Sequence, residues 1–400
     1  MNARWEDGRV TLIDFDAITE DQLRAVGATK WRRPGAIGAW IAEMDFGLAP
    51  VIREALVEQI ERGQTGYATA PMVRGMQEAY AGWSPEHYGW EVDPEQVRPM
   101  PDVVAGLVFM LDHLIPAGST VVLPTPAYMP FLTLPQLHGH EVVQVPMARD
   151  GESWVYDLDE VDAALADNAG LLVLCNPHNP IGRVLEPGEM APLTELVEKH
   201  RVRVFSDEIH APIVFAGHAH VPYASTSEAA SRHTVTSTSA SKAWNLPGLK
   251  TAQMVLTNDG DRELWAQMGD FVEHGASNPG LVANAVAYRA GEPWLDEVLG
   301  YVGETRTWFA EEVGRRLPGA FATVPEGTYL SLVDLRGVEG SERWGTAPGE
   351  YLSQHARVDL TEGSLCGAAS DGWVRVNLGS TRPILSEALD RMAEALARNS

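Results

Sequence analysis

AGLLVLCNPHNPIGRVLEPGEMAPLTELVEKHRVRVFSDEIH, residues 169–210, is the most informative segment of the chain for its architecture. Two strand candidates, 169–177 and 201–209, stand at its ends. Between them, 186–200 has apolar residues spaced i, i+3 and i+4, the period of an amphipathic helix. Continuous apolar strands separated by a helix predict a parallel sheet that is covered on both faces.

The same alternation extends outward from this segment over about residues 119–258. Further strands are expected at 119–124, 140–147, 234–240 and 252–258, with another helix at 157–167. We therefore predict an α/β fold whose large domain has a mostly parallel sheet covered by helices.

Beyond residue 280 the alternation becomes less regular, which predicts a smaller α+β C-terminal domain. Its expected elements are helices at 292–317, 348–357 and 384–398 and strands at 328–336 and 373–380. We divide the chain into an N-terminal arm (1–45) that joins the small domain, a large domain (46–289) and a small domain (290–400).

The composition restricts the class of protein. The 400 residues are 45% hydrophobic and carry a formal charge of −25, so the surface repels nucleic acids and anionic membranes. The longest apolar stretch, 103–115, is interrupted by Asp112 and His113 and cannot span a bilayer. The N-terminal residues lack a signal-peptide core. Cys175 and Cys366 do not form a disulfide framework, and we expect a soluble, cytoplasmic protein.

Polar groups follow several of the expected strands. They are Asn176–Gly182, Asp207–His210, Ser241–Lys242 and Thr125–Tyr128. Each has an ordinary explanation as a turn, a helix cap or packing. Ligands of open α/β sheets bind beyond the carboxyl ends of the strands, so their coincidence indicates a binding crevice.

The residue types in this crevice favour one cofactor. A buried lysine amine, Lys242, can form a Schiff base with a carbonyl, and a buried carboxylate, Asp207, can pair with a protonated ring nitrogen. An asparagine can donate to a phenolate, a tyrosine can stack on a ring, and small residues can bring backbone N–H groups to a phosphate. Such a lysine and aspartate are used to bind pyridoxal 5′-phosphate (PLP).

Seven stretches carry a family resemblance over nearly the whole chain. They are WIAEMDF (40–46), GYATAP (66–71), LPTPAYMPF (123–131), NPHNPIG (176–182), SDEIH (206–210), SASKAWNLPGLK (239–250) and RVNLGSTR (375–382). The chain resembles the PLP-dependent class I/II aminotransferase superfamily of aspartate-aminotransferase-like fold type I. Within it, the chain most resembles the cystathionine β-lyase branch of MalY/PatB type.

The resemblance implies roles around the cofactor ring. Lys242 matches the Schiff-base lysine, which also transfers protons, and Asp207 matches the partner of the ring nitrogen. Asn179 matches the donor to the ring oxygen, and Tyr128 the stacking aromatic. His210 stands where many aminotransferases have tyrosine, as in the lyase branch. Lys242, Asp207 and Tyr128 are the expected catalytic residues.

The resemblance also implies how the phosphate is held. Ser239 and Lys250 match phosphate contacts, and Val103 and Val104 match backbone N–H donors at a helix start. Tyr67 matches a tyrosine that reaches the phosphate of the neighbouring subunit, which implies a homodimer with shared active sites.

On the substrate side, Arg375 matches the arginine that binds the α-carboxylate, and Trp40 lies in a segment that borders the substrate in relatives. Three residues depart from the lyase pattern: Glu43, Pro212 and Asp102 stand where aspartate, an acidic residue and a small residue are common.

The expected activity is a carbon–sulfur β-lyase that acts on an amino acid. The same residues would serve an aminotransferase, which is the alternative, and a non-catalytic binding protein that keeps the fold is a further one. The histidines near 210–220 lack metal-site spacing, so no metal is expected.

Overall fold

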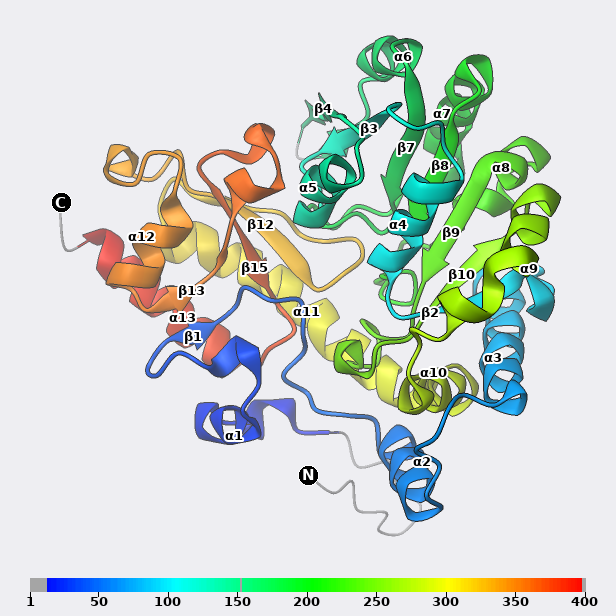
Figure 1. Ribbon diagram of the computed structural model, residues 1–400. Helices are drawn as coiled ribbons and strands as arrows, with labels where there is room; N and C mark the ends of the chain where they lie inside the picture. Colours follow the sequence, from blue (N-terminus) through cyan, green and yellow to red (C-terminus); the bar gives the residue numbers. More distant parts are fainter. Residues whose placement is uncertain (1–12, 152, 398–400) are drawn as a thin grey trace.

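A seven-stranded sheet forms the centre of the larger part of the molecule (Figure 1). The computed structural model describes residues 13–151 and 153–397. In sheet order the strands are β2 (Val97–Met100), β10 (Ala252–Leu256), β9 (Thr234–Thr238), β8 (Arg203–Asp207), β7 (Ala169–Cys175), β3 (Thr120–Thr125) and β4 (Val142–Pro146). β10 runs antiparallel to both of its neighbours, and the other pairs are parallel. The expectation of a mostly parallel sheet is therefore confirmed.

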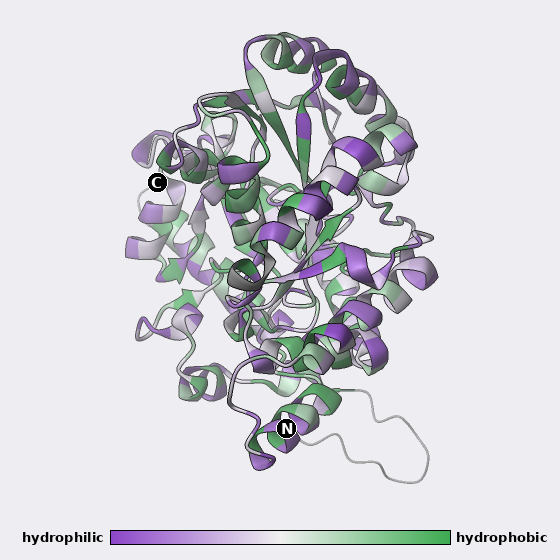
Figure 2. Ribbon diagram, turned by 45° about the vertical axis from the view of Figure 1, so that its right-hand side comes forward, coloured by the Kyte–Doolittle hydropathy of each residue, from purple (hydrophilic) through white to green (hydrophobic). Residues whose placement is uncertain are grey.

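Both faces of this sheet are buried under helices. The helices are α4 (Val103–His113), α5 (Met129–Leu137), α6 (Leu158–Ala166), α7 (Pro187–His200), α8 (Glu228–His233) and α9 (Asp259–Glu273). Along β7, Leu171 and Val173 join the apolar cluster of α4, α5 and α9, whereas Leu172 and Leu174 join that of α6 and α7. Burial of both faces explains why β7 is continuously apolar. Figure 2 shows hydrophobic strands beneath helices whose outer sides are hydrophilic.

Local signals in the sequence start and end these helices. α6 begins after Asp157, whose carboxylate accepts a hydrogen bond from the backbone N–H of Glu160 (3.2 Å). Such a cap satisfies a helix N–H group that has no partner within the helix. α7 has Pro187 in its first turn, and it ends at Arg201, whose left-handed backbone turns the chain into β8.

Three further helices pack against one another beside strand β2 of the large sheet. They are α2 (Pro50–Glu61), α3 (Ala70–Tyr88) and α10 (Asn278–Ala290). The long α11 (Glu292–Arg316) continues from α10 toward the smaller part of the molecule (Figure 1).

The smaller part contains an antiparallel four-stranded sheet, β11 (Phe321–Ala322), β12 (Leu330–Asp334), β15 (Trp373–Asn377) and β14 (Thr361–Glu362). Helices α12 (Pro348–His355) and α13 (Arg382–Ala397) pack with α11 around it. A short hairpin, β5 (Ala148–Asp150) and β6 (Ser153–Val155), extends from the large sheet.

The N-terminal segment lies against the smaller part (Figure 1). After α1 (Glu20–Val26), strand β1 (Ile37–Gly38) pairs in parallel with β13 (Val358–Asp359). Residues 1–12 of the expected arm lie outside the described residues. Within residues 13–151 and 153–397, the helices fall short of the length and apolarity that a membrane crossing requires.

The register of the central strands brings three strand ends together. Cys175, the last residue of β7, pairs with Asp207, the last residue of β8, and Asp207 pairs with Ser237 near the end of β9. The segments that follow these strands therefore emerge side by side at one edge of the sheet.

Candidate active site

A cavity of about 400 Å³ lies at this edge. Most of the site residues predicted from the sequence line it, namely Trp40, Val103, Val104, Tyr128, Asn179, Asp207, His210, Lys242, Lys250 and Arg375. Segments that are separated by more than 300 residues in the chain thus meet at one place, as the strand-end rule requires.

Lys242 has a buried amine in this cavity. Its Nζ donates a hydrogen bond to the backbone oxygen of Ala42 (2.9 Å). Burial, together with the nearby charge of Arg375, lowers the pKa of Lys242 to about 8, although the charges of Glu43 and Asp207 oppose the shift. A larger share of Lys242 is therefore neutral near pH 7 than for an exposed lysine, and a neutral amine is the nucleophilic and basic form.

Asp207 is a buried carboxyl group without a cationic partner in hydrogen-bond contact among the described residues. Its Oδ1 accepts from the backbone N–H of Ile209 (3.1 Å), and the Sγ of Cys175 lies 3.9 Å from Oδ2. Burial raises the pKa of Asp207 to about 7. A positively charged N–H group in the cavity would stabilise the carboxylate and reverse this shift.

Arg375 is a buried cation. It is 3% exposed, and no carboxylate of the described chain forms an ion pair with it. Its Nη1 donates to Asn179 Oδ1 (3.1 Å), and its Nη2 donates to the Trp40 oxygen (2.9 Å) and to Thr361 Oγ1 (3.1 Å), while Nε has no partner. A buried charge held only by neutral groups is costly, so the site favours an anionic ligand.

The hydrogen bond from Arg375 also orients Asn179. Because the amide oxygen accepts from Arg375, the NH₂ group of Asn179 is left to donate toward the cavity.

Two rings complete the walls of the cavity. Tyr128 precedes α5, and its ring packs edge-on against Phe131 with 5.4 Å between centroids. His210 is fully buried, its Nδ1 has no partner, and its ring lies 5.9 Å from that of Tyr329. Burial lowers the pKa of His210 well below its usual value, so the ring is neutral at pH 7.

The start of α4 forms one end of the cavity. Val103 and Val104 are its first two residues, and Lys250 lines the same region. Asp102 accepts from the backbone N–H of Ala105 (2.9 Å) and pairs with Lys250 Nζ (2.6 Å). The aspartate that departs from the family pattern therefore caps the helix and contacts a predicted phosphate ligand.

Ser239 and Tyr67 are the predicted residues that do not line the cavity. The Ser239 hydroxyl donates to the Thr251 oxygen (2.8 Å) and accepts from the N–H of Ser241 (3.0 Å). It therefore shapes the loop before Lys242, and Ser241 lines the cavity instead. Tyr67 is 92% exposed and lies beside a separate hollow formed with α2 residues, including Ile60.

Sequence reasoning did not identify three contributors to the site. The Ala42 oxygen accepts from both Lys242 and the Tyr329 hydroxyl, and Thr361 accepts from Arg375. Ala42 stands in the quoted WIAEMDF stretch, which was a usable signal. Tyr329 and Thr361 stand in the small part of the chain, in segments without a local motif.

The other two departures, Glu43 and Pro212, do not line the cavity. Glu43 follows Ala42 in the sequence, and its negative charge raises the pKa of Lys242. Pro212 is buried.

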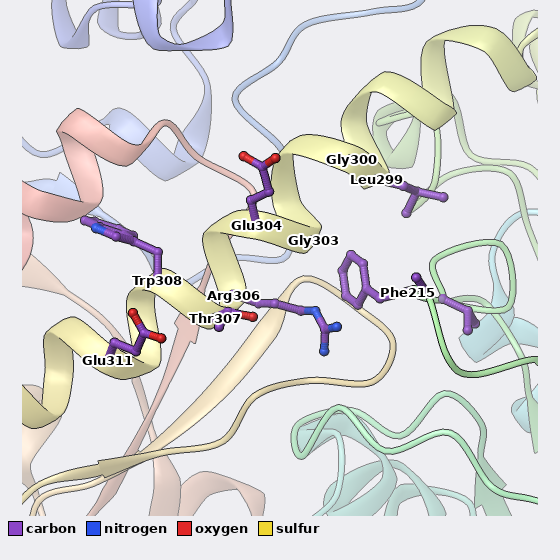
Figure 3. A pocket seen from close by; sticks show the side chains of 11 residues that line it. Phe215, Leu299, Gly300, Gly303, Glu304, Arg306, Thr307, Trp308 and Glu311 are labelled. Atoms are coloured by element: carbon purple, nitrogen blue, oxygen red, sulfur yellow. The ribbon is translucent and has the colours of Figure 1, made fainter.

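A second and larger hollow, of about 720 Å³, lies beside α11 (Figure 3). The Arg306 guanidinium lies over the Phe215 ring at 4.7 Å and donates to the Pro325 oxygen (2.6 Å). In the described part of the chain, this hollow is lined by no lysine, aspartate or histidine. The smaller cavity, which combines an amine, a carboxyl group and an unpaired guanidinium, is therefore the candidate site.

The histidines of residues 210–220 have separate surroundings. His220 Nε2 contacts buried Glu208 (3.0 Å), and His218 lies 3.9 Å from Glu326. Within the described ranges, no group of three metal-ligating side chains is found.

Comparisons with known proteins agree with this geometry. The family model for aminotransferase class I and II matches residues 41–392. Cystathionine β-lyase of Corynebacterium glutamicum is 35% identical over 378 residues, which cover 94% of this chain and 98% of that protein. Cystathionine β-lyase PatB of Bacillus subtilis is 30% identical over 386 residues, covering 92% and 97%. The crystal structure of a protein assigned as a PLP-dependent β-cystathionase of Corynebacterium diphtheriae matches with a TM-score of 0.88 and 34% identity, covering 95% and 98%.

Proposed function

The chain belongs to the class I and II aminotransferase family, and on that premise we propose that it is a carbon–sulfur β-lyase. It has the aspartate-aminotransferase-like fold of type I and depends on PLP. It cleaves L-cystathionine or related S-substituted L-cysteines to a thiol, pyruvate and ammonia. The relatives from Corynebacterium glutamicum and Bacillus subtilis, which match this chain over nearly their full length, are named cystathionine β-lyases. The observation that carries the proposal is a cavity shared by the Lys242 amine, the Asp207 carboxyl group and the Arg375 guanidinium, which has no carboxylate partner among the described residues.

The cavity offers a complementary group for each part of PLP. Lys242 would bond to the aldehyde, and Asp207 would hold the ring nitrogen in its protonated state. The free NH₂ of Asn179 would donate to the ring oxygen. The start of α4 and the ammonium of Lys250 would hold the phosphate, since helix N-termini and lysines bind anions. The residues present therefore fit the cofactor.

When bound, PLP supplies an electron sink for the electron pair that loss of the α-proton leaves on the substrate. Arg375 binds the α-carboxylate and fixes the orientation of the substrate, because it is a buried guanidinium that has no ionic partner among the described residues. The Lys242 amine takes the α-proton onto Nζ, a role suited to its lowered pKa of about 8.

Cleavage then follows from the substrate's own bonds. The electron pair from Cα forms a double bond to Cβ, the C–S bond breaks, and sulfur leaves with its electron pair as a thiolate. Lys242, now protonated at Nζ, would return this proton to the departing sulfur, which gives the thiol. The released 2-aminoacrylate is hydrolysed to pyruvate and ammonia.

An aminotransferase activity is the second candidate, because the family model carries that description. It uses the same base and differs in where the proton returns. The two outcomes are distinguished by supplying L-cystathionine or S-methyl-L-cysteine without any keto acid. The lyase releases equal amounts of pyruvate and thiol, measured by coupled lactate dehydrogenase and a thiol reagent.

The control variants are Lys242→Ala, which should be inactive, and Lys199→Ala, which removes an exposed lysine outside the cavity. Turnover that requires an added keto acid and yields no thiol would reject the lyase in favour of the aminotransferase.

We also propose a homodimer with shared active sites, in which Tyr67 of each subunit contacts the phosphate of the other. In support, Tyr67 is almost fully exposed and lies outside the cavity of its own chain, and it lines a separate hollow with the exposed apolar residue Ile60 of α2. Sedimentation of the purified protein, together with mixed variants described below, tests the arrangement.

The proposed domain limits are an arm at 1–45, a large domain at 46–289 and a small domain at 290–400. The pairing of β1 with β13 supports the attachment of the arm to the small domain. The proposed location is the cytoplasm, supported by the free, buried state of Cys175 and Cys366.

A further inference from the structure

Asp102 occupies the Lys250 ammonium, which is a predicted phosphate ligand, together with one N–H group in the first turn of α4. One carboxylate oxygen accepts from the N–H of Ala105 in the first turn of the helix (2.9 Å), and the other pairs with Lys250 Nζ (2.6 Å). Both Asp102 and Lys250 line the cavity. The backbone N–H groups of a first turn and an adjacent ammonium are the groups that bind a phosphate.

The contact between Asp102 and Lys250 is weak enough to be replaced. The two side chains are 40% and 58% exposed, and ion pairs with this exposure contribute little net stability. A phosphate with a charge near −2 interacts more strongly with the same donors than a single carboxylate does.

The negative charge of Asp102 also extends into the cavity. Burial raises the pKa of the Tyr128 hydroxyl, the charge of Asp207 adds to the rise, and that of Asp102 adds a further part. An anion that takes a hydrogen bond from Lys250 Nζ would lie within about 6 Å of the Asp102 carboxylate, since each contact is shorter than about 3 Å.

We propose that Asp102 is an internal competitor of the cofactor phosphate: its carboxylate occupies the Lys250 ammonium in the cofactor-free protein and repels the phosphate once it is bound. The proposal rests on PLP binding in this cavity. Asp102 thereby weakens the affinity for PLP and favours exchange of the cofactor, which a small residue at this position would not do.

The test removes the charge but keeps the helix cap. Asparagine and serine are both good N-cap residues, so Asp102→Asn and Asp102→Ser preserve the start of α4. The dissociation constant for PLP is measured with apoprotein by the visible absorbance of the lysine-bound cofactor. Asp157→Asn is the matched control, because Asp157 caps α6 in the same way and lies outside the cavity.

We expect both Asp102 variants to bind PLP about tenfold more tightly than the wild type, and Asp157→Asn to bind equally well. A tenfold change in the dissociation constant corresponds to about 1.4 kcal/mol, which is a reasonable repulsion energy between the Asp102 carboxylate and the phosphate at this distance near a protein surface. Unchanged or weaker binding in both Asp102 variants would overturn the proposal. Failure of the wild type to bind PLP would instead reject the proposed function.

A second readout separates charge repulsion from a purely structural effect. The phosphorus resonance of bound PLP is followed by NMR as a function of pH. A neighbouring carboxylate disfavours the phosphate dianion, so the midpoint should be higher in the wild type than in Asp102→Asn. The other titratable or charged groups that line the cavity are the same in both proteins, namely Tyr128, Asp207, His210, Lys242, Lys250 and Arg375. Equal midpoints would contradict the proposal.

Discussion

The amine of Lys242 should react as a base of unusually low pKa in the cofactor-free protein. Burial lowers its pKa from 10.5 to about 8, with Arg375 as the second cause. At pH 7 a pKa of 8 leaves about 10% of the amine neutral, whereas a pKa of 10.5 leaves about 0.03%. The difference is about 300-fold in nucleophilic amine and is the chemical reason for placing Lys242 in a closed cavity.

The assay is competitive acetylation of the apoprotein between pH 6 and 11, with mass spectrometry of the lysine peptides. Exposed Lys199, at the end of α7, serves as the internal reference. The relative acetylation rate of Lys242 should rise with pH and reach its midpoint near pH 8. Arg375→Met should move this midpoint upward, because it removes a neighbouring positive charge, while Arg336→Met on the exposed surface should not.

A midpoint near 10 in the wild type would refute the reasoning, since it would show that Lys242 is not desolvated. A midpoint near pH 8 that is the same in the wild type and in Arg375→Met would refute only the role of the guanidinium in lowering the pKa of Lys242.

Three further outcomes are expected. Arg375→Lys should lower kcat/KM by about 30-fold or more, because loss of a buried charge pair costs about 2–5 kcal/mol. The control Arg336→Lys, on the exposed surface, should leave kcat/KM unchanged. Equal kcat/KM values for the two variants would contradict a role of Arg375 in substrate binding. A mixed dimer of one Tyr67→Ala subunit and one Lys242→Ala subunit should recover PLP affinity in one of its two sites, because that site combines Lys242 of one subunit with Tyr67 of the other. Titration of the mixture with PLP measures the recovery. No recovery would contradict shared active sites. The apoprotein of Lys242→Met should be more stable than the wild type at pH 7, by at most about 3 kcal/mol, because below pH 8 the folded wild type bears the full cost of burying the ammonium. This difference in the free energy of unfolding should decrease as the pH rises from 8 toward 10.5. Urea unfolding of both proteins at pH 7 and pH 10 measures it.

The large sheet was predictable because its strands are buried on both faces. β7 appears as an uninterrupted apolar run, β8 contains the apolar pair Val204 and Phe205, and a helix of clear period separates the two strands. β2 was not predicted, because its four residues include a proline and lie at an edge of the sheet. The antiparallel direction of β10 was also hidden, because an apolar strand has the same pattern in both directions.

The polar side chains at the strand ends were predictable for the same reason as the sheet. Asp207 and Asn179 follow recognisable strands, and the register of the sheet then places them together. Thr361 and Tyr329 could not be found in this way, because tertiary packing of the small part of the chain brings them to the cavity. The role of Asp102 depends on a contact with Lys250, which is 148 residues away.

The most direct test is to locate the covalent attachment of the cofactor. The purified protein is incubated with PLP, reduced with borohydride, digested and analysed by mass spectrometry. The pyridoxyl group should be found on Lys242, and the visible absorbance should be absent from Lys242→Ala. A label on another lysine, or no label at all, would contradict the assignment of this cavity as a PLP site.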